Sequence, residues 1–151
     1  MDFAYNDEQK EIIKVVRDLV EKEIVPYASE MDETGKLHEG LLEKLAAQGL
    51  LGVAIPEEFG GAGLDAITIA AIYEELGKGC AGVATTVAAN ALASYPVIIA
   101  GNDDQKKRYF DIINEDNLAA FALTEPGTGS DAGSVSTRAM KTEDGKGYIL
   151  N

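Results

Sequence analysis

The chain has 151 residues, 46% of them hydrophobic, which is enough for a globular domain with a buried core. Its 26 acidic and 13 basic residues give a formal net charge of -13. This balance argues against binding a nucleic-acid backbone or an anionic membrane surface through bulk charge. A phosphorylated ligand stays compatible, because it needs only a few local hydrogen-bond donors.

The start of the chain lacks a basic region followed by an apolar core, so the sequence predicts no signal peptide. The run nearest to the roughly 20 apolar residues of a membrane span is 81–100, and it contains Asn90, Ser94 and Pro96. The single cysteine, Cys80, cannot form an internal disulfide and is expected to be a small packed residue. These features favour a cytoplasmic protein that does not cross a membrane.

Short helices are predicted through the first third of the chain. Asn6 and Gln9 form a capping pair typical of a helix start, and apolar residues then recur at helical spacing. Pro26 is expected to break or restart this helix, because its ring clashes with the preceding turn. Further helices are predicted at 27–33 and 39–48, each followed by a glycine.

A glycine-rich loop at 57–63 separates these helices from a second set. Asp65 is expected to cap the next helix. The almost wholly apolar helix at 82–93 is predicted to be buried on all sides at the centre of a bundle. Pro96 would then start one separate turn, and a capping pair at 102–105 would open a helix to about Glu115.

The pattern changes after residue 117. A strand is predicted at 118–123, an alternating stretch at 134–142, and another apolar run at 148–150. We therefore expect a mainly α fold, in which a helical bundle domain over 1–117 is followed by an incomplete β-domain over 118–151. Since two or three strands rarely stand alone, the chain is expected to be part of a longer protein or to need a partner.

The segment 124–131 is the strongest candidate for a ligand site. Pro126, Gly127 and Gly129 favour a tight turn that lets the backbone approach a ligand. Successive backbone N–H groups in such a turn form a concavity for an anion, and hydroxyl side chains add donors. From the residues alone, an ordinary turn between two strands is the favoured interpretation.

Other site patterns do not match. The glycines at 60–63 lack the strand–turn–helix setting and the lysine that nucleotide loops need. His38 is the only histidine and has no ligand at metal-binding spacing, so no metal site is predicted. Its side chain is expected to cap the following helix or to lie in solvent, and a Ser–His–acid triad is not indicated.

Residues 121–131, with the sequence F-A-L-T-E-P-G-T-G-S-D, resemble the F-x-L-T-E-P-x-A-G-S-D signature of acyl-CoA dehydrogenases. Thr128 stands where that family usually has alanine, and the glycines and Ser130 are in place. The resemblance extends to 55–65, 73–77, 101–106 and 148–151 as well. These ordered motifs cover essentially the whole chain.

The resemblance implies that the protein binds FAD and oxidises an acyl-CoA thioester to the trans-2-enoyl-CoA. The residues implied to line the cofactor are Phe121, Ala122, Leu123, Thr124, Glu125, Pro126, Gly127, Thr128, Gly129 and Ser130. Ser130 would touch both the flavin and the acyl-CoA. For Glu125 and Asp131, stabilising the turn is the simpler interpretation.

The acyl tail in this family lies near the end of a helix that corresponds to residues 90–97 here. The implied substrate contacts are Leu92, Ser94 and Tyr95, together with Ser130. Tyr95 could shorten the cavity and favour short or medium chains, or it could simply pack at a helix break.

The family's catalytic glutamate would lie beyond Asn151, so no catalytic residue is assigned, and the chain alone is expected to be inactive. The implied partners are an acyl-CoA, an electron-transferring flavoprotein and further copies in a homotetramer. Two alternatives stay open. One is a helical interaction fragment without catalysis, and the other is an oxidase-type flavoenzyme of the same superfamily.

Overall fold

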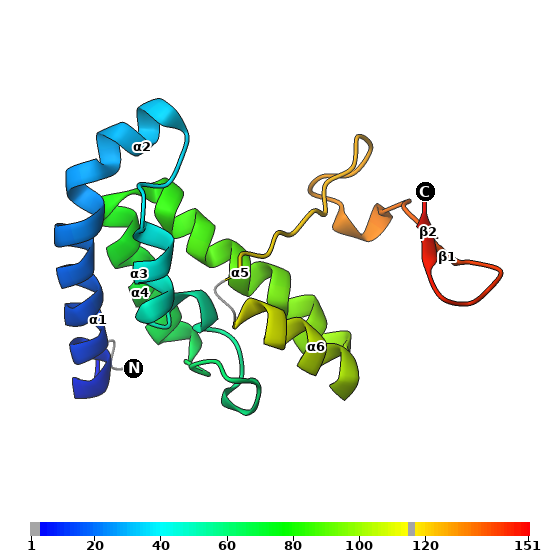
Figure 1. Cartoon of the computed structure of the whole chain (residues 1–151), viewed down its shortest axis with the longest axis horizontal. Coiled ribbons are helices and arrows are strands. Elements are labelled where there is room, and N and C mark those ends of the chain that lie inside the picture. Colours follow the sequence, from blue (N-terminus) through cyan, green and yellow to red (C-terminus); the bar gives the residue numbers. More distant parts are fainter. Residues whose placement is uncertain (1–3, 115–116) are drawn as a thin grey trace. The chain divides into compact units, whose positions relative to one another are not determined.

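The computed structural model describes residues 4–114 and 117–151. It divides into two compact units, one running to Ala120 and the other from Phe121 to Asn151. The first unit contains the helices and the second contains the strands, as Figure 1 shows. The predicted mainly α fold, followed by the beginning of a β-region, is thus confirmed.

The first helical stretch is longer than the sequence suggests. Helix α1 (Asp7–Leu19) begins at the predicted capping box, where the Gln9 N–H donates to Asn6 Oδ1 at 2.8 Å. The backbone stays helical beyond it through a π-helical turn (Val20–Ile24), a 3₁₀ turn (Val25–Tyr27) and α2 (Ala28–Thr34). Pro26 is accommodated because it sits at the start of the 3₁₀ turn, where its missing N–H is not needed.

Helix α3 (Leu41–Ala47) and the loop after it build one wall of the main core. The predicted glycine stop at Gly49 is confirmed by its left-handed φ of 70°. Two short 3₁₀ turns follow (Leu50–Gly52 and Glu57–Phe59).

The prediction for α5 (Ala81–Ala100) was wrong in two respects. The helix continues through Pro96 as one 20-residue element, instead of ending near residue 93. It is also not buried all round, because Leu92, Tyr95 and Ile99 are 49%, 42% and 81% exposed. Packing against α4 (Ala66–Gly79) covers one face and leaves this apolar stripe open.

By length and composition alone, α5 could cross a membrane, a test that core helices of soluble proteins also pass. Asn90 and Ser94 are fully buried within the first unit, but only 28% of the most apolar window of the helix is buried. The expectation that no run in the chain approaches a membrane span therefore needs this correction.

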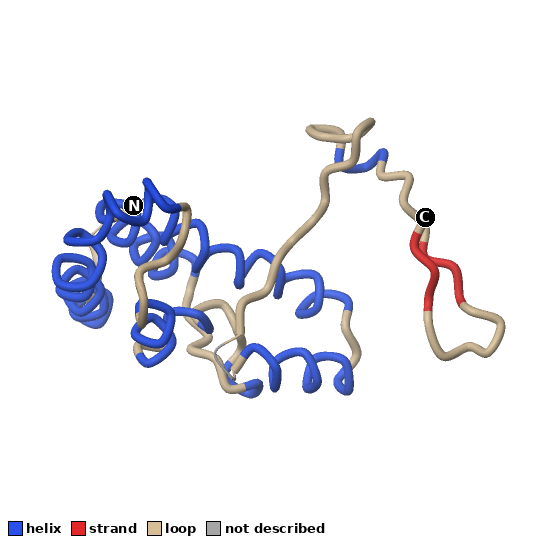
Figure 2. Tube along the Cα trace, turned by 45° about the horizontal axis from the view of Figure 1, so that its top comes forward, coloured by secondary structure: helices blue, strands red, loops and turns tan. Residues whose placement is uncertain are grey.

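Helix α6 (Asp103–Ile113) lies beside α5 in Figures 1 and 2 and opens at the predicted capping box of Asn102 and Gln105. Its expected end at Glu115 lies outside the described residues. Two clusters form the interior of the first unit. The larger one joins α1, α3, α4 and α5, and the smaller one is built around Ile55, Phe110 and Ile113.

The second unit contains an antiparallel hairpin of β1 (Ala139–Lys141) and β2 (Tyr148–Leu150), in which Met140 faces Ile149. The strand predicted at 118–123 is not formed, which corrects the sequence interpretation. The segment is extended, but within the described part of the chain no neighbouring strand pairs with it, and a strand needs such a ladder.

Candidate functional site

The loop predicted to meet the ligand is a closed turn inside the second unit. Glu125 and Thr128 exchange backbone hydrogen bonds of 3.1 and 3.0 Å across Pro126 and Gly127. The reciprocal pair holds the turn without help from its side chains. The backbone around it is therefore fixed before any ligand arrives.

The carboxylate of Glu125 ties this turn to the next segment of the chain. It accepts hydrogen bonds from the backbone N–H of Ser136 at 2.9 Å, the hydroxyl of Ser136 at 2.8 Å and the backbone N–H of Thr137 at 2.9 Å. The bonds from Thr137 and Ser136 lower the pKa of Glu125 to about 2. This carboxylate is thereby occupied within the loop, as the turn-stabilising interpretation expects.

The side chains of Thr128 and Asp131 also stabilise the loop, through hydrogen bonds to Ser134. The buried hydroxyl of Thr128 donates to the carbonyl of Ser134 at 3.1 Å. The carbonyl of Asp131 accepts the Ser134 N–H at 3.0 Å, and its carboxylate accepts the Ser134 hydroxyl. Thr128, which replaces the usual alanine, therefore uses its extra hydroxyl inside the loop.

The hydroxyl groups of Thr124 and Ser130 are the side-chain donors of the loop that are available to a ligand. Both residues are exposed, and within the described residues neither hydroxyl has a hydrogen-bond partner. A Cβ added at Gly127 or Gly129 would meet no atom within 4 Å, so the surface above these glycines is open. Exposed hydroxyls beside accessible backbone suit the polar edge of a ring or a phosphate. The donor set thus fits the flavin that the motif implies.

The predicted acyl-tail residues lie on α5 but face different ways. Leu92 and Tyr95 belong to the exposed stripe, whereas Ser94 is fully buried and donates to the carbonyl of Asn90 at 2.7 Å. These three residues belong to the first unit and the flavin loop belongs to the second. Whether Leu92, Ser94, Tyr95 and Ser130 contact a substrate stays a prediction.

Asn90 is a polar residue whose importance the sequence did not reveal. It is fully buried, and its amide accepts the N–H of Ala119 at 2.7 Å. The same amide donates to the carbonyls of Asn117 at 3.3 Å and Leu51 at 3.4 Å. The available signal was a lone carboxamide in an apolar helix, but its partners lie 27 to 39 residues away in sequence.

The sequence also did not reveal an ion pair between α1 and α4, in which the carboxylate is buried and the guanidinium is half exposed. The guanidinium of Arg17 donates to the two carboxylate oxygens of Glu75 at 2.9 and 3.1 Å, and Lys78 donates to one of them at 2.8 Å. Hydrogen bonding from Arg17 is the largest cause that lowers the pKa of Glu75 to about 2. The cluster joins the two helices and is a structural feature of the first unit.

The glycine-rich loop at 60–63 is a packing device. Gly63 N–H donates to Ile55 O at 2.8 Å, and a Cβ on Gly61 would lie 2.2 Å from the same oxygen. The loop therefore folds tightly back on residues 52–56, and only a glycine fits at position 61. This explains why the stretch is glycine-rich without any nucleotide-loop setting.

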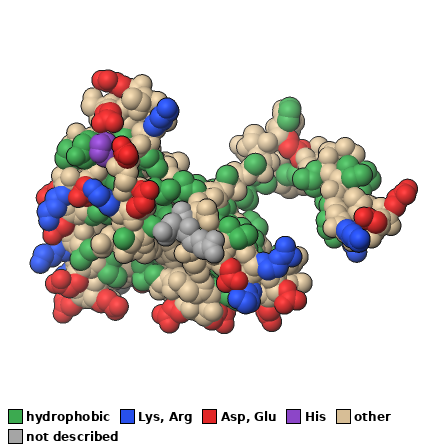
Figure 3. All heavy atoms as spheres, in the orientation of Figure 1, with side chains coloured by type: hydrophobic (Ala, Val, Ile, Leu, Met, Phe, Trp, Pro, Cys, Tyr) green, Lys and Arg blue, Asp and Glu red, His purple; other side chains and the backbone are tan. Residues whose placement is uncertain are grey.

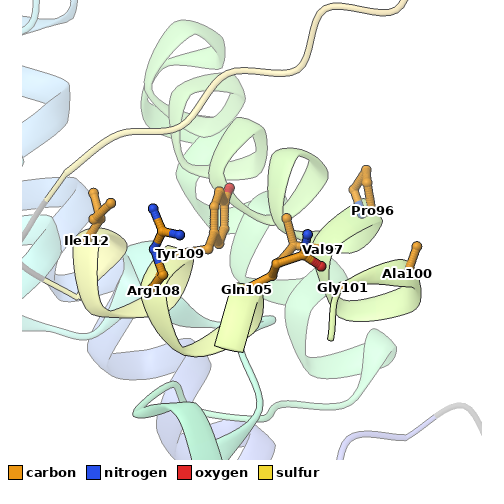
Figure 4. Close-up of a pocket in the computed structure, with 8 residues that line it drawn as sticks. All are labelled: Pro96, Val97, Ala100, Gly101, Gln105, Arg108, Tyr109 and Ile112. Atoms are coloured by element: carbon orange, nitrogen blue, oxygen red, sulfur yellow. The ribbon is translucent and has the colours of Figure 1, made fainter. Parts of the chain in front are cut away.

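A groove of about 540 Å³ lies between the end of α5 and α6, lined by the residues labelled in Figure 4. Its floor is apolar, with Val97 and Ile112 among the lining residues, and Arg108 stands at its side. Within the described residues, the buried hydroxyl of Tyr109 has no hydrogen-bond partner.

His38 is placed differently from the prediction. Its ring stacks on Tyr27 with centroids 3.5 Å apart, and its Nδ1 lies 3.5 Å from a carboxylate oxygen of Glu30. The aromatic contact holds the ring against α2, so the side chain neither caps α3 nor lies free in solvent. In residues 4–114 and 117–151, no group of three or more His, Cys, Asp or Glu side chains could hold a metal ion.

Acidic side chains are distributed over the face of the first unit that Figure 3 shows, with basic side chains between them. The net charge of -13 therefore reflects a solvated surface.

Comparisons with known proteins agree with the sequence motifs. Residues 6–115 match the model of the acyl-CoA dehydrogenase N-terminal domain. A 3-(aryl)acrylate reductase from Clostridium sporogenes is 43% identical over 95% of this chain and 38% of its own length. An acyl-CoA dehydrogenase from Bacillus subtilis is 39% identical over 95% of this chain and 38% of its own length.

Solved structures give the same result. Butyryl-CoA dehydrogenase from Megasphaera elsdenii matches with a TM-score of 0.85 at 35% identity, over 100% of this chain and 40% of that one. An acyl-CoA dehydrogenase from Bacillus anthracis in complex with FAD matches with a TM-score of 0.83 at 37% identity, over 97% and 26%. A chain from the study of the electron transferring flavoprotein of Acidaminococcus fermentans has a TM-score of 0.88 at 34% identity, over 100% and 40%.

The chain thus spans about two-fifths of the length of the curated relatives, 38% of each of the two named above. The family model covers most of the helical unit, and the solved butyryl-CoA dehydrogenase aligns with the whole chain. The chain belongs to the acyl-CoA dehydrogenase family and carries its N-terminal helical domain.

Proposed function

We propose that this chain is the N-terminal part of an FAD-dependent acyl-CoA dehydrogenase, with the loop 121–130 lining the flavin. The observation that supports this most directly is the braced turn with two unpartnered hydroxyls, Thr124 and Ser130, at an open surface. A related acyl-CoA dehydrogenase is known in complex with FAD.

The bound flavin would supply hydride acceptance from the β-carbon of an acyl-CoA, while a carboxylate outside this chain removes the α-proton. The residues of this chain do the binding and orienting. The hydroxyl of Thr124 and nearby backbone N–H groups donate to the polar edge of the ring and favour negative charge there. The carboxylate of Glu125 would hold this surface in place through the backbone of Ser136 and Thr137.

The acyl tail would lie along the exposed stripe of α5. Leu92 and Tyr95 offer apolar area there, and a buried Ser94 keeps the helix turn in place. A tyrosine on this face favours short or medium acyl chains, or chains ending in an aromatic ring that can pack against it. Electrons would pass to an electron-transferring flavoprotein, and the whole protein would be a cytoplasmic homotetramer.

A second candidate is the reverse reaction, in which the flavoprotein reduces the double bond of an arylacrylate or its thioester. The 43% identity with a 3-(aryl)acrylate reductase favours this candidate, and the exposed Tyr95 is compatible with an aryl substrate. Both reactions would use the same loop and the same hydride position.

The test begins with the full-length protein and its FAD content. Stopped-flow spectra would then follow two reactions under anaerobic conditions: reduction of the oxidised flavin by acyl-CoAs, and oxidation of the reduced flavin by 3-phenylacrylate or its CoA ester. Faster reduction by acyl-CoA supports the dehydrogenase, and faster oxidation by the arylacrylate supports the reductase. A full-length protein that holds no flavin would contradict both.

A further inference from the structure

Asn90 connects three parts of the helical unit through one side chain. It lies on α5, its amide nitrogen donates to the carbonyl of Leu51, and the same amide binds the backbone at Asn117 and Ala119. The side chain has no solvent exposure. A buried carboxamide is costly unless it is hydrogen-bonded, so these three bonds are what makes Asn90 acceptable inside the unit.

The bonds to the segment after α6 have the geometry of a strand partner. Asn90 gives a donor to the carbonyl of Asn117 and an acceptor to the N–H of Ala119. A neighbouring parallel strand would pair with these same two groups, one residue before and one residue after Leu118. One side-chain amide therefore stands in for a ladder that is otherwise missing along this segment.

This pairing fixes which side chains of the stretch point to which face. In extended backbone, alternate side chains point to opposite faces, and a slip of one residue exchanges the two faces. Ala120 follows, and then residues 121–124, which open the proposed flavin loop. Two other contacts hold this segment: the side-chain amide of Asn117 donates to the carbonyl of Ile112 at 2.8 Å, and Ala119 packs against the smaller core cluster. The Asn90 amide is the group that binds the backbone carbonyl of Asn117 and the backbone N–H of Ala119.

The same residue also anchors the part of α5 proposed for the acyl tail. The hydroxyl of Ser94 donates to the carbonyl of Asn90 at 2.7 Å, and Leu92 is only two residues along the helix. This bond uses the backbone carbonyl at position 90, so it leaves the Asn90 side-chain amide to Leu51 and the segment after α6.

We propose that Asn90 is a positioning residue, which fixes the backbone of residues 117–119 against α5 within the first unit, directly before the chain continues into the flavin loop. This inference rests on the proposed flavin function. In this proposal Asn90 contacts neither the flavin nor the substrate, and it acts through the backbone of Asn117 and Ala119.

The test compares three variants in the full-length flavoprotein. Asn90→Leu keeps the branched shape of the side chain, with a larger volume, and removes its three hydrogen bonds, while Asn90→Asp keeps an acceptor for the Ala119 N–H. Thr68→Val is the matched control, because Thr68 is also buried and hydrogen-bonded, but to Asp65 and Gln9 on the other side of the unit. Thermal unfolding, the flavin absorption spectrum, kcat and KM are measured for each.

We expect Asn90→Leu to alter the flavin spectrum and to lower kcat by about 10- to 100-fold with little change in KM, as misplacement of a reacting group does. Asn90→Asp should lose less, and Thr68→Val should keep the wild-type spectrum and kcat even where its unfolding temperature falls as far. If Asn90→Leu fails to fold, the contrast between Asn90→Asp and Thr68→Val decides the matter.

Equal spectra and equal kcat in the Asn90 variants and Thr68→Val would overturn the positioning role while leaving the flavin function intact. A wild-type protein whose flavin no acyl-CoA or arylacrylate affects would instead overturn the proposed function itself.

Discussion

Arg17 on α1 grips the buried carboxylate of Glu75 on α4 with hydrogen bonds of 2.9 and 3.1 Å, although the guanidinium side chain itself is half exposed. The contact joins the two helices through residues that are 58 positions apart in sequence. It holds α1 against α4 within the first unit. It also makes the stability of that unit depend on pH in the acid range.

The pKa of Glu75 is lowered to about 2 from its ordinary 4.5, chiefly by Arg17. A lowered pKa means that the stabilisation is complete above about pH 4.5 and is lost as the pH falls toward 2. The shift corresponds to on the order of 2 kcal/mol once the exposure of Arg17 is discounted. We predict that Glu75→Gln flattens the acid limb of the unfolding free energy, as measured by urea titration between pH 6 and 3.

Lys107 and Asp111 supply the control for that prediction, because they form an exposed ion pair on α6. Asp111→Asn should leave the acid limb unchanged. An acid limb that is equally steep in Glu75→Gln and the wild type would contradict the role given to this carboxylate.

Gly61 is predicted to tolerate no side chain. A Cβ there would lie 2.2 Å from the carbonyl oxygen of Ile55, which is backbone and cannot rotate away. Gly61→Ala should therefore cost about 3 kcal/mol. Gly52→Ala is the matched control, since the nearest atom to its Cβ would be 3.7 Å away. Chemical denaturation of both variants checks the difference, and equal stabilities would refute the tight packing.

Glu125 is predicted to protect two backbone amides in the loop. Its carboxylate accepts hydrogen bonds from the N–H groups of Ser136 and Thr137. Because its pKa is lowered to about 2, the stabilisation from these hydrogen bonds is lost only as the pH falls from about 4.5 toward 2. In Glu125→Ala, both amides should exchange with solvent faster at pH 6. Hydrogen exchange measured by NMR gives the rates, with Asp144→Asn in the hairpin turn as the control.

Unchanged exchange at Ser136 and Thr137 in Glu125→Ala would contradict the protection assigned to the Glu125 carboxylate.

Ser130 is predicted to face the cofactor and the thioester. Its hydroxyl is exposed and, in the described part of the chain, has no partner that its removal would disturb. Ser130→Ala in the full-length enzyme should weaken FAD or substrate binding by about 1 kcal/mol per lost hydrogen bond while leaving the unfolding temperature unchanged. Unchanged flavin retention together with unchanged kinetic constants would remove Ser130 from the site.

Local chemistry explains which parts of the fold could be predicted from the sequence. The capping boxes at Asn6 and Asn102 and the stop at Gly49 depend on residues within one turn, so their pattern was sufficient. The course of α5 past Pro96 depends on packing against α4, which outweighs the local cost of the missing N–H.

The candidate site divides in the same way. The turn at 125–128 was predicted from proline and glycine, because these residues fix the local backbone. The partners of Glu125 lie 11 and 12 residues along the chain, and those of Asn90 lie 27 to 39 residues away. No local pattern encodes such pairs, so the residues that brace the site emerged only from the fold.

The most direct test of the central claim is an anaerobic titration of the full-length protein with butyryl-, octanoyl- and branched acyl-CoAs, followed by flavin absorbance. We expect a yellow protein whose flavin band is bleached by at least one of these thioesters. Bleaching should be faster with the shorter acyl chains, which Tyr95 allows. A protein whose flavin no acyl-CoA bleaches would contradict the assignment as a dehydrogenase.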